Sequence, residues 1–255
     1  MYDYLLGGNH NYAIDREFAE QLVRVTPGVR QFAVANRQFL GRAVRYAMGQ
    51  GVRQFVDIGS GLPTQGNVHE VADEVAPGEA RVVYIDNEPI AHAHAAILLE
   101  RTADPGRHHA LHGDFFDGPQ LWDRILATGY VDPSRPVCLL AVALLHFMPP
   151  DREPERVLEF FRDKLAPGSL LVVSHAAIDP DDPALRDTAK RVTENYAERA
   201  TQSAHLRPHE EVAALFGDFE LVDPGLVWLS DWRPTEPAFG APARSGAYGG
   251  VARKP

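Results

Sequence analysis

The sequence contains a single cysteine and no long apolar run. Cys138 cannot form an internal disulfide, and in its apolar surroundings a buried thiol behaves as a small hydrophobic side chain. The longest apolar run spans 137–145, far short of the roughly 20 residues that a membrane helix needs. No basic region followed by an apolar stretch opens the chain, so we expect no signal peptide. These absences predict a soluble, cytoplasmic protein without membrane contact.

Positive charge is also scarce. The 255 residues include 25 Lys+Arg against 35 Asp+Glu, a net charge of −10, and the only lysines are Lys164, Lys190 and Lys254. A nucleic-acid-binding protein needs a basic surface, so we expect no nucleic acid as partner. The apolar share of 45% is that of a globular chain and excludes general disorder. The composition does not indicate an oligomeric state.

Before residue 50 the apolar spacing is helical, and one polar residue interrupts it. Asn36 lies on the apolar side, four residues from both Phe32 and Leu40. A polar side chain in that position needs a hydrogen-bond partner. Two interpretations stay open, a structural hydrogen bond and a contact with a ligand.

From residue 52 onward short apolar runs alternate with helical segments. This alternation predicts a parallel sheet covered on both faces, within one domain that carries an N-terminal helical cap. The predicted strands are 52–58, 81–86, 107–112, 137–145, 169–174, 219–223 and 246–253. The predicted helices are 65–76, 89–101, 119–127, 153–165, 183–202 and 208–216.

Ligands of such sheets lie outside the carboxyl ends of the strands, so the residues after each strand are the candidate site. The first strand leads into Asp57, Gly59 and Gly61, and glycine allows a tight turn and close approach of a ligand to the backbone. A dinucleotide fingerprint would have glycine at position 64, but Thr64 stands there. This disfavours a nicotinamide-dependent oxidoreductase without excluding it.

Carboxylates follow three successive strands. Asp57, Asp86 and Asp114 are spaced by about 28 residues, and this repeat is more specific than the glycine pattern alone. The second acid is placed to hold a ribose diol, and the third could accept from an exocyclic amine while Phe115 covers a ring. Each acid could instead be structural, as a turn cap, a strand end or an Asx turn. A ligand with a diol and an amine would use all of them.

Four segments carry a resemblance to a known family. They are YDYLLGGNHNY at 2–12, NRQFL at 36–40, FVDIGSGLPT at 55–64 and VYIDNEP at 83–89. On these the chain resembles the class I S-adenosylmethionine (SAM)-dependent methyltransferases, and in particular an actinobacterial family long described as a domain of unknown function. The resemblance implies an α/β, Rossmann-like, doubly wound and mostly parallel seven-stranded sheet. It further implies a cap or lid at 1–50 and a SAM-binding domain at 51–255.

The resemblance also implies roles for individual residues. The glycine turn would line the amino-acid and ribose parts of SAM, and Asp57 would orient the turn or bind the SAM ammonium group. The acid of the second strand would bind the ribose, the acid of the third the adenine amine, and the 143–145 backbone would face the sulfonium. We favour a lid over the cofactor for the segment around Gly7 and Gly8. The cofactor-binding residues expected are Tyr12, Asp57, Gly59, Ser60, Gly61, Asp86, Asn87, Asp114, Phe115 and Leu145.

The histidines and one tyrosine supply candidate catalytic groups. His146 and His175 follow the fourth and fifth strands, where either could act as general base or simply pack. Tyr196, on the helix after the fifth strand, could line an acceptor pocket. No H-E-x-x-H motif or cysteine pair occurs, so we expect no metal.

The function that these observations favour is methyl transfer from SAM to an unidentified, small-molecule acceptor. The sulfonium makes the methyl group electrophilic, so the enzyme mainly positions donor and acceptor. The alternative is a SAM-binding protein without transferase activity, acting as a sensor or partner subunit, because both kinds of protein would keep the cofactor acids.

Overall fold

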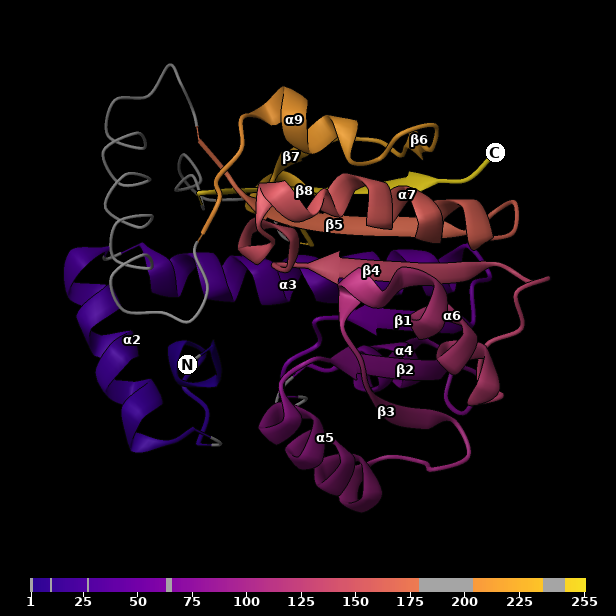
Figure 1. Ribbon diagram of the computed structural model, residues 1–255, viewed down its shortest axis with the longest axis horizontal. Helices are drawn as coiled ribbons and strands as arrows, with labels where there is room; N and C mark the ends of the chain where they lie inside the picture. The colour runs from indigo at the N-terminus through magenta and orange to yellow at the C-terminus, as the bar shows by residue number, and fades with distance from the viewer. Residues whose placement is uncertain (1, 10, 27, 63–65, 179–203, 236–245) are drawn as a thin grey trace.

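The computed structural model of the protein describes residues 2–9, 11–26, 28–62, 66–178, 204–235 and 246–255 (Figure 1). The predicted helix over 183–202, with Tyr196, lies outside the described residues, as does Thr64.

An eight-stranded sheet forms the centre of the molecule. Its order is β3-β2-β1-β4-β5-β8-β6, and β7 pairs with β8 outside this path. The first five strands are parallel, whereas β8 runs antiparallel to β5, β6 and β7. The predicted mostly parallel sheet is therefore confirmed, with the two-residue β7 as an addition. The strands are β1 (Gln54–Ile58), β2 (Arg81–Asp86), β3 (His108–His112), β4 (Val137–Val142), β5 (Leu170–Ala176), β6 (Glu220–Leu221), β7 (Val227–Trp228) and β8 (Ala247–Arg253).

The order of the strands reverses between β1 and β4. The chain runs outward through β2 and β3 and then returns to β4 and β5 on the other side of β1. At such a switch point the loops diverge and leave a crevice for a ligand. The arrowheads of β1, β2 and β4 point toward the side on which the N-terminal helices lie (Figure 1).

Helices cover both faces of the sheet. Because neighbouring residues of a strand point to opposite faces, Phe55 packs with the α3 and α4 side and Val56 with the α6 and α7 side. The α-helices are α1 (Tyr2–Leu5), α2 (Ala13–Val25), α3 (Val29–Gly49), α4 (Val68–Val75), α5 (Pro89–Thr102), α6 (Gly118–Ala127), α7 (Pro154–Lys164) and α9 (His209–Ala214). Short 3-10 helices are η1 (Phe115–Asp117), η2 (Leu145–Phe147), η3 (Pro150–Arg152) and η4 (Leu229–Asp231).

The fourth strand is shorter than its apolar run. The sequence predicts a strand over 137–145, but β4 ends at Val142 because Ala143 has a φ of 53°, which no strand residue adopts. The chain then turns into η2. The predicted end of this strand was wrong, since an apolar run does not reveal a left-handed residue.

The first helices differ in what they pack against. Leu5 of α1, Ala19 of α2 and Ala33 of α3 form a small cluster of their own. Further along α3, Phe39 and Val44 belong to the same cluster as the sheet. The predicted division at residue 50 stays a prediction, with α3 as the helix that joins the cap to the core.

Candidate functional site

The turn after β1 depends on glycine. Gly59 has a φ of 72°, which glycine adopts without strain. The N–H groups of Gly59 and Ser60 both donate to the Ile85 carbonyl, at 2.8 and 3.0 Å. A Cβ on Gly59 would lie 2.5 Å from Leu144 Cδ1. Bare backbone is therefore held against the Leu144 side chain in the loop after β4, and a Cβ at Gly59 would displace that side chain.

Asp86, the last residue of β2, fixes the other half of this turn. Its Oδ2 accepts from the Gly61 N–H at 2.8 Å, and its Oδ1 accepts from the Glu88 N–H at 2.9 Å. A carboxylate offers about four acceptor positions, so the half-buried Asp86 retains capacity for ligand hydroxyls. The next residue, Asn87, is exposed, and its carbonyl lies 3.1 Å from His112 Nε2.

Asp114 follows β3 beside Asp86. The Gly113 N–H donates to the Asp86 carbonyl at 3.0 Å, which joins the two strand ends. Asp114 Oδ1 accepts from the Phe116 N–H at 2.9 Å, which is the contact that an Asx turn would make. Its Oδ2 lies 4.0 Å from Arg152 Nη1. One oxygen thus caps η1, and the other has no close partner among the described residues.

Two expected cofactor contacts have side chains in the core. Phe115 is 3% exposed and stacks on Phe161 with ring centroids 5.8 Å apart, and Leu145 is 1% exposed. A ring packed in this way cannot cover a purine. Any contact of these two residues with a cofactor would come from their backbone, because the structure turns both side chains inward.

Asp57 is the most enclosed carboxyl of the site. It is 7% exposed, one residue before the end of β1. Its pKa is raised to about 7, mainly by burial; the positive charge of Arg37 opposes this rise and the negative charge of Asp86 adds to it. A cation bound beside Asp57 would favour its ionised form.

A chain of hydrogen bonds connects α1 with the turn after β4. The Ala143 N–H donates to Ser174 Oγ at 2.8 Å, and the Ser174 hydroxyl donates to Asn36 Oδ1 at 2.5 Å. Asn36 Nδ2 donates to the Tyr2 hydroxyl at 2.9 Å, which donates in turn to the Ala33 carbonyl at 3.0 Å. Asn36 is 3% exposed, so the structural hydrogen bond is the interpretation that the structure supports.

The candidate bases His146 and His175 lie side by side, with ring centroids 5.5 Å apart. Nδ1 of His175 donates to the Ala176 carbonyl at 2.8 Å, and its Nε2 has no partner among the described residues. Burial lowers the pKa of His175 to about 4 and that of His146 well below its ordinary value. Both rings are therefore neutral at physiological pH. Tyr196, the third candidate, falls outside the described residues.

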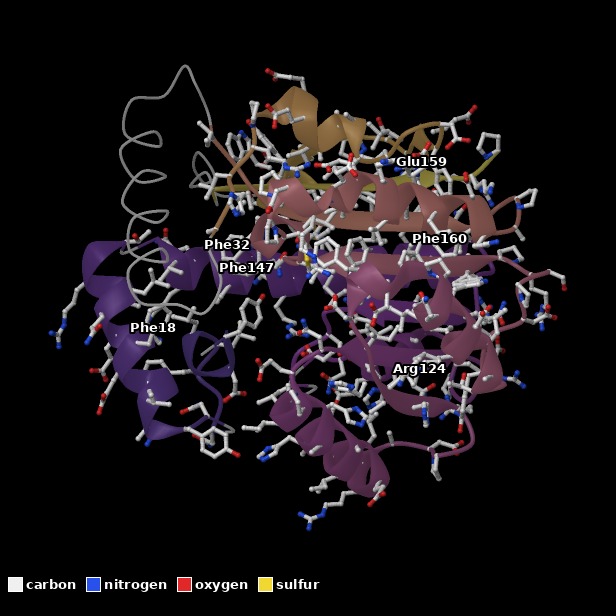
Figure 2. All side chains as sticks on the ribbon, in the orientation of Figure 1. Phe18, Phe32, Arg124, Phe147, Glu159 and Phe160 are labelled. Carbon is white, nitrogen blue, oxygen red and sulfur yellow. The ribbon has the colours of Figure 1, made fainter. Side chains whose placement is uncertain are left out.

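Aromatic rings surround His146. Its ring centroid lies 4.2 Å from that of Phe147 and 6.2 Å from that of Phe32. Figure 2 shows Phe32 of α3 and Phe147 of η2 close together, near the end of β4. An apolar, aromatic cluster thus lies beside the turn that Ser174 holds.

The N-terminal segment reaches from α1 to α5. The Tyr12 hydroxyl lies 2.8 Å from His94 Nε2, on the helix that begins just after β2. At the other end of the segment Asn11 Nδ2 donates to Asp3 Oδ2 at 2.8 Å. The N-terminal segment is thus tied to α5, and the lid over the cofactor stays a prediction.

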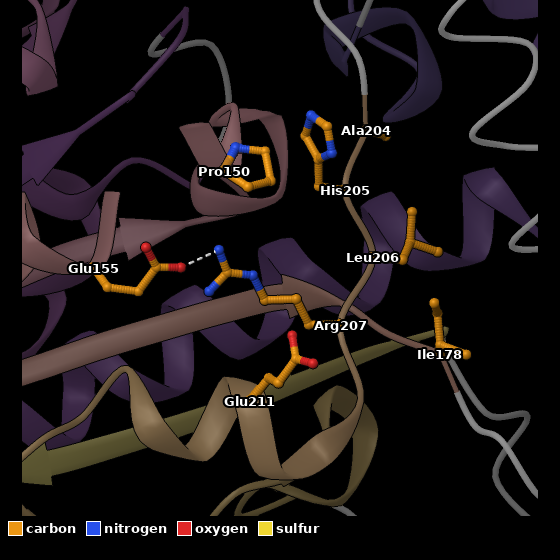
Figure 3. A pocket seen from close by; sticks show the side chains of 8 residues that line it. All are labelled: Pro150, Glu155, Ile178, Ala204, His205, Leu206, Arg207 and Glu211. Atoms are coloured by element: carbon orange, nitrogen blue, oxygen red, sulfur yellow. Dashed lines mark ion pairs between the residues drawn. The ribbon is translucent and has the colours of Figure 1, made fainter. Parts of the chain in front are cut away.

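A hollow of about 420 Å³ lies at the loops that follow β4 and β5 (Figure 3). The buried Arg207 forms an ion pair there with Glu155. The His205 N–H donates to the His146 carbonyl at 2.7 Å, so the hollow adjoins the aromatic cluster. Its lining residues are Pro150, Glu155, Ile178, Ala204, His205, Leu206, Arg207 and Glu211.

Two features are absent from the described residues, a cluster of metal ligands and a membrane-spanning helix. Within these ranges no three His, Cys, Asp or Glu side chains come together as metal ligands would. No helix in the described part of the chain combines the length and hydropathy that a membrane crossing requires.

Known proteins resemble the chain over its whole length. The S-adenosyl methyltransferase family matches residues 1–255. The chain belongs to this family. Two solved structures are similar to it: a methyltransferase from Thermobifida fusca (37% identity, TM-score 0.89, covering 99% of this chain and 92% of that one) and a DUF574 family protein from Streptomyces avermitilis (34%, TM-score 0.88, covering 100% and 95%).

A curated relative from Mycolicibacterium smegmatis is named as a SAM-dependent methyltransferase. It is 30% identical over 173 residues, which cover 67% of this chain and 52% of the relative. The chain spans about half the length of the curated relatives that it matches. The expected family, the class I fold and the SAM cofactor are confirmed by these comparisons.

The site of this S-adenosyl methyltransferase family member fits its cofactor in chemical terms. SAM carries a ribose diol, an amine, a carboxylate and two positive groups. Asp86 and Asp57 supply carboxylates, the Gly59 turn offers backbone with no room for a Cβ, and Arg37 Nε is buried without a partner among the described residues. Asp86 would hold the ribose, Asp114 the adenine amine, and Asp57 the ammonium group.

Sequence reasoning assigned no side-chain role to three residues that shape the site. Ser174 and Leu144 shape the turn after β4, and Arg37 of α3 lies beside the glycine turn. Only Arg37 had a signal in the sequence, since it stands next to Asn36 in the NRQFL segment. The roles of Ser174 and Leu144 depend on contacts between loops, which spacing along the chain does not encode.

Proposed function

We propose that this protein transfers the methyl group of SAM to a small-molecule acceptor at the carboxyl edge of the sheet. The observation that carries the proposal is the Asp86 carboxylate, bonded to the Gly61 N–H at 2.8 Å and joined through the Gly113 N–H to the strand end that bears Asp114. This arrangement supports a nucleoside held between the ends of β2 and β3.

SAM, when bound, supplies a methyl group that is already electrophilic on its sulfonium. The residues of the chain then need to orient the donor and the acceptor, enclose both and exclude water. Such positioning can lower a reaction barrier by roughly 7–11 kcal/mol. The turn at Ala143, held by Ser174, is the backbone that we assign to the reactive end of the cofactor. The aromatic cluster around His146 would border the acceptor.

We propose that neither His146 nor His175 is a strong base. Burial keeps both neutral, but a ring whose pKa is lowered in this way removes a proton less readily than an imidazole with its ordinary pKa. His175 Nδ1 is also committed to the Ala176 carbonyl. Positioning of the acceptor is thus the role proposed for this pair.

The choice of a small molecule rests on enclosure and charge. The Tyr12–His94 contact connects the N-terminal segment to α5 beside Asp86, which leaves less room for a macromolecule. The net charge of −10 also disfavours a polyanionic acceptor.

Binding and turnover test this proposal. Calorimetry should give low-micromolar or tighter binding of SAM, and Asp86→Ala should weaken it by about 1–3 kcal/mol through loss of charge-assisted hydrogen bonds. Asp123→Ala, at an exposed position of α6, is the matched control and should bind normally.

Formation of S-adenosylhomocysteine with a panel of small acceptors measures the transfer itself. No binding to the folded protein would overturn the site. Binding without turnover of any acceptor would favour the alternative, a SAM-binding protein without transferase activity. Turnover only with a protein or nucleic acid would overturn the acceptor class.

A further inference from the structure

Arg37 is a positive charge beside the loop that follows β1. Its Nε is buried and has no hydrogen-bonding partner among the described residues. Its guanidinium carbon lies 5.6 Å from the Tyr2 ring centre, and its Cδ would lie 3.6 Å from a Cβ on Gly66. The side chain thus lies between α1 and the loop after β1.

Other arginines enclosed in the fold have their partners. Arg42 donates to the Leu229 and Trp232 carbonyls at 2.5 and 2.7 Å. Arg162 also has a buried Nε without a hydrogen bond, but its Nη1 donates to the Leu215 carbonyl at 2.6 Å and its Nε lies 4.0 Å from Asp218 Oδ1. A buried donor left without an acceptor destabilises the folded protein, and a charged donor does so more strongly. The buried Nε of Arg37 is therefore a charged hydrogen-bond donor for which the described residues supply no acceptor.

The charges around Arg37 define the ligand group that it can take. Asp57 is close enough for the Arg37 charge to oppose the rise of its pKa, and Asp86 acts on the same carboxyl. Carboxylates from β1 and β2 suit the positive and hydroxyl groups of a ligand. A guanidinium suits a planar carboxylate, which it binds through two parallel hydrogen bonds.

We propose that Arg37 binds the α-carboxylate of the methionyl part of SAM and makes the site select nucleosides that carry the amino acid. The proposal rests on the cofactor site proposed above. With Asp57 taking the ammonium group, the two side chains would hold both charges of the amino acid between α3 and β1. The preference for nucleosides that carry the amino acid would then come from α3, which precedes the first strand of the sheet.

A purely structural role is the competing explanation, because Arg37 also lies over the Tyr2 ring. The chain offers a matched control for that role on the same helix. The Arg30 guanidinium carbon lies 5.1 Å from the Tyr4 ring centre, in an exposed position away from the glycine turn. Loss of a cation–π contact alone should therefore affect Arg30 and Arg37 variants alike.

Calorimetry with two nucleosides tests the proposal. S-adenosylhomocysteine carries the amino acid, and 5′-methylthioadenosine lacks it. We expect Arg37→Gln to weaken binding of S-adenosylhomocysteine about 10- to 100-fold, to change methylthioadenosine binding less than about 2-fold, and Arg37→Lys to fall between. Arg30→Gln should change neither affinity.

Equal losses for both nucleosides, or no loss for either, would overturn the role of Arg37. Wild-type protein that binds neither nucleoside would instead overturn the cofactor site itself. If Arg37→Gln does not fold, decarboxylated SAM tests the same contact on unaltered protein, since it should bind about 10- to 100-fold more weakly than SAM. Equal affinity for the two donors would contradict the proposal.

Discussion

At the scale of the residue, single atoms decide whether the cofactor site exists. Gly59 illustrates this, because its left-handed backbone and its closeness to Leu144 both exclude a side chain. Asp86 is a second case, since one carboxylate holds two backbone N–H groups and still faces the site. Such residues combine a structural and a binding role, so the two interpretations of an acid at a strand end are not exclusive.

Gly59→Ala should destabilise the protein more than the same change at another left-handed glycine. The new Cβ would lie 2.5 Å from Leu144 Cδ1, so we expect a loss of about 2–4 kcal/mol in the free energy of unfolding. Gly78→Ala is the control, with a φ of 82° and open space around it, and should cost about 1–2 kcal/mol. Urea unfolding measures both.

The double variant Gly59→Ala/Leu144→Ala separates the clash from the backbone strain. Removal of the Leu144 side chain should restore part of the loss caused by Gly59→Ala, as a coupling of about 0.5–3 kcal/mol. Equal costs at Gly59 and Gly78, together with additive double-variant data, would contradict a clash at this position.

At the scale of the element, α3 contributes to two parts of the site. Phe39 and Val44 pack it against the sheet, while Asn36 connects it to the turn after β4. The same helix presents Arg37 to the turn after β1. A helix that precedes the sheet therefore aligns the loops of β1 and β4 at the switch point.

Ser174→Ala should reduce stability and also affect the cofactor. It leaves the buried Asn36 Oδ1 without its donor, so we expect a loss of about 1–3 kcal/mol in the free energy of unfolding. Because the Ala143 N–H loses its 2.8 Å acceptor, binding of S-adenosylhomocysteine should weaken as well. Calorimetry and chemical unfolding measure the two effects.

Ser169→Ala is the matched control for this prediction. Ser169 is also fully buried, but its hydroxyl accepts from the Val137 N–H at 3.0 Å, at the opposite end of the sheet. Its loss should lower stability without a change in cofactor affinity. If both serine variants bind S-adenosylhomocysteine as the wild type does, the Ala143 turn does not contact the cofactor.

At the scale of the whole molecule, burial sets the response to acid. Desolvation lowers the pKa values of four enclosed imidazoles, to about 4 for His108 and His175 and below the ordinary value for His69 and His146. Asp57 affects stability in the opposite direction, because its pKa in the folded protein is raised to about 7. The balance of these groups determines how stability changes between about pH 4 and 7.

The free energy of unfolding should fall as the pH drops from about 6.5 toward 4. In this window the unfolded chain binds protons at histidines that stay neutral in the folded protein, so acid favours unfolding. The loss should be on the order of 1–3 kcal/mol, since protonation of Asp57 in the folded state offsets part of it. Chemical unfolding at several pH values measures the slope.

Two variants separate the opposing contributions. Asp57→Asn removes a carboxyl that takes up a proton near pH 7 in the folded protein and so stabilises the folded state in acid. Without it, the decline in stability toward acid should become steeper. His108→Gln removes one depressed imidazole and should make the decline shallower. Stability that stays constant from pH 7 to pH 4 in the Asp57→Asn variant, where that offset is removed, would show that these histidines are not desolvated.

The sequence by itself determined the order of strands and helices and the edge at which the site lies. Apolar runs of strand length alternate with helical segments, and parallel strands bring their carboxyl ends to one edge. Asp57, Asp86 and Asp114 therefore had to come together once the sheet formed. Hydrophobic periodicity and register suffice for this part, because both are local properties of the chain.

The tertiary structure alone decided which of the neighbouring residues face the site. Phe115 and Leu145 directly follow strand ends, yet their side chains pack in the core, since η1 and η2 turn the backbone there. Arg37 and Asn36 precede the sheet and reach the site only because α3 packs against it. Burial likewise sets the pKa of His175, because desolvation depends on neighbours far away in the chain.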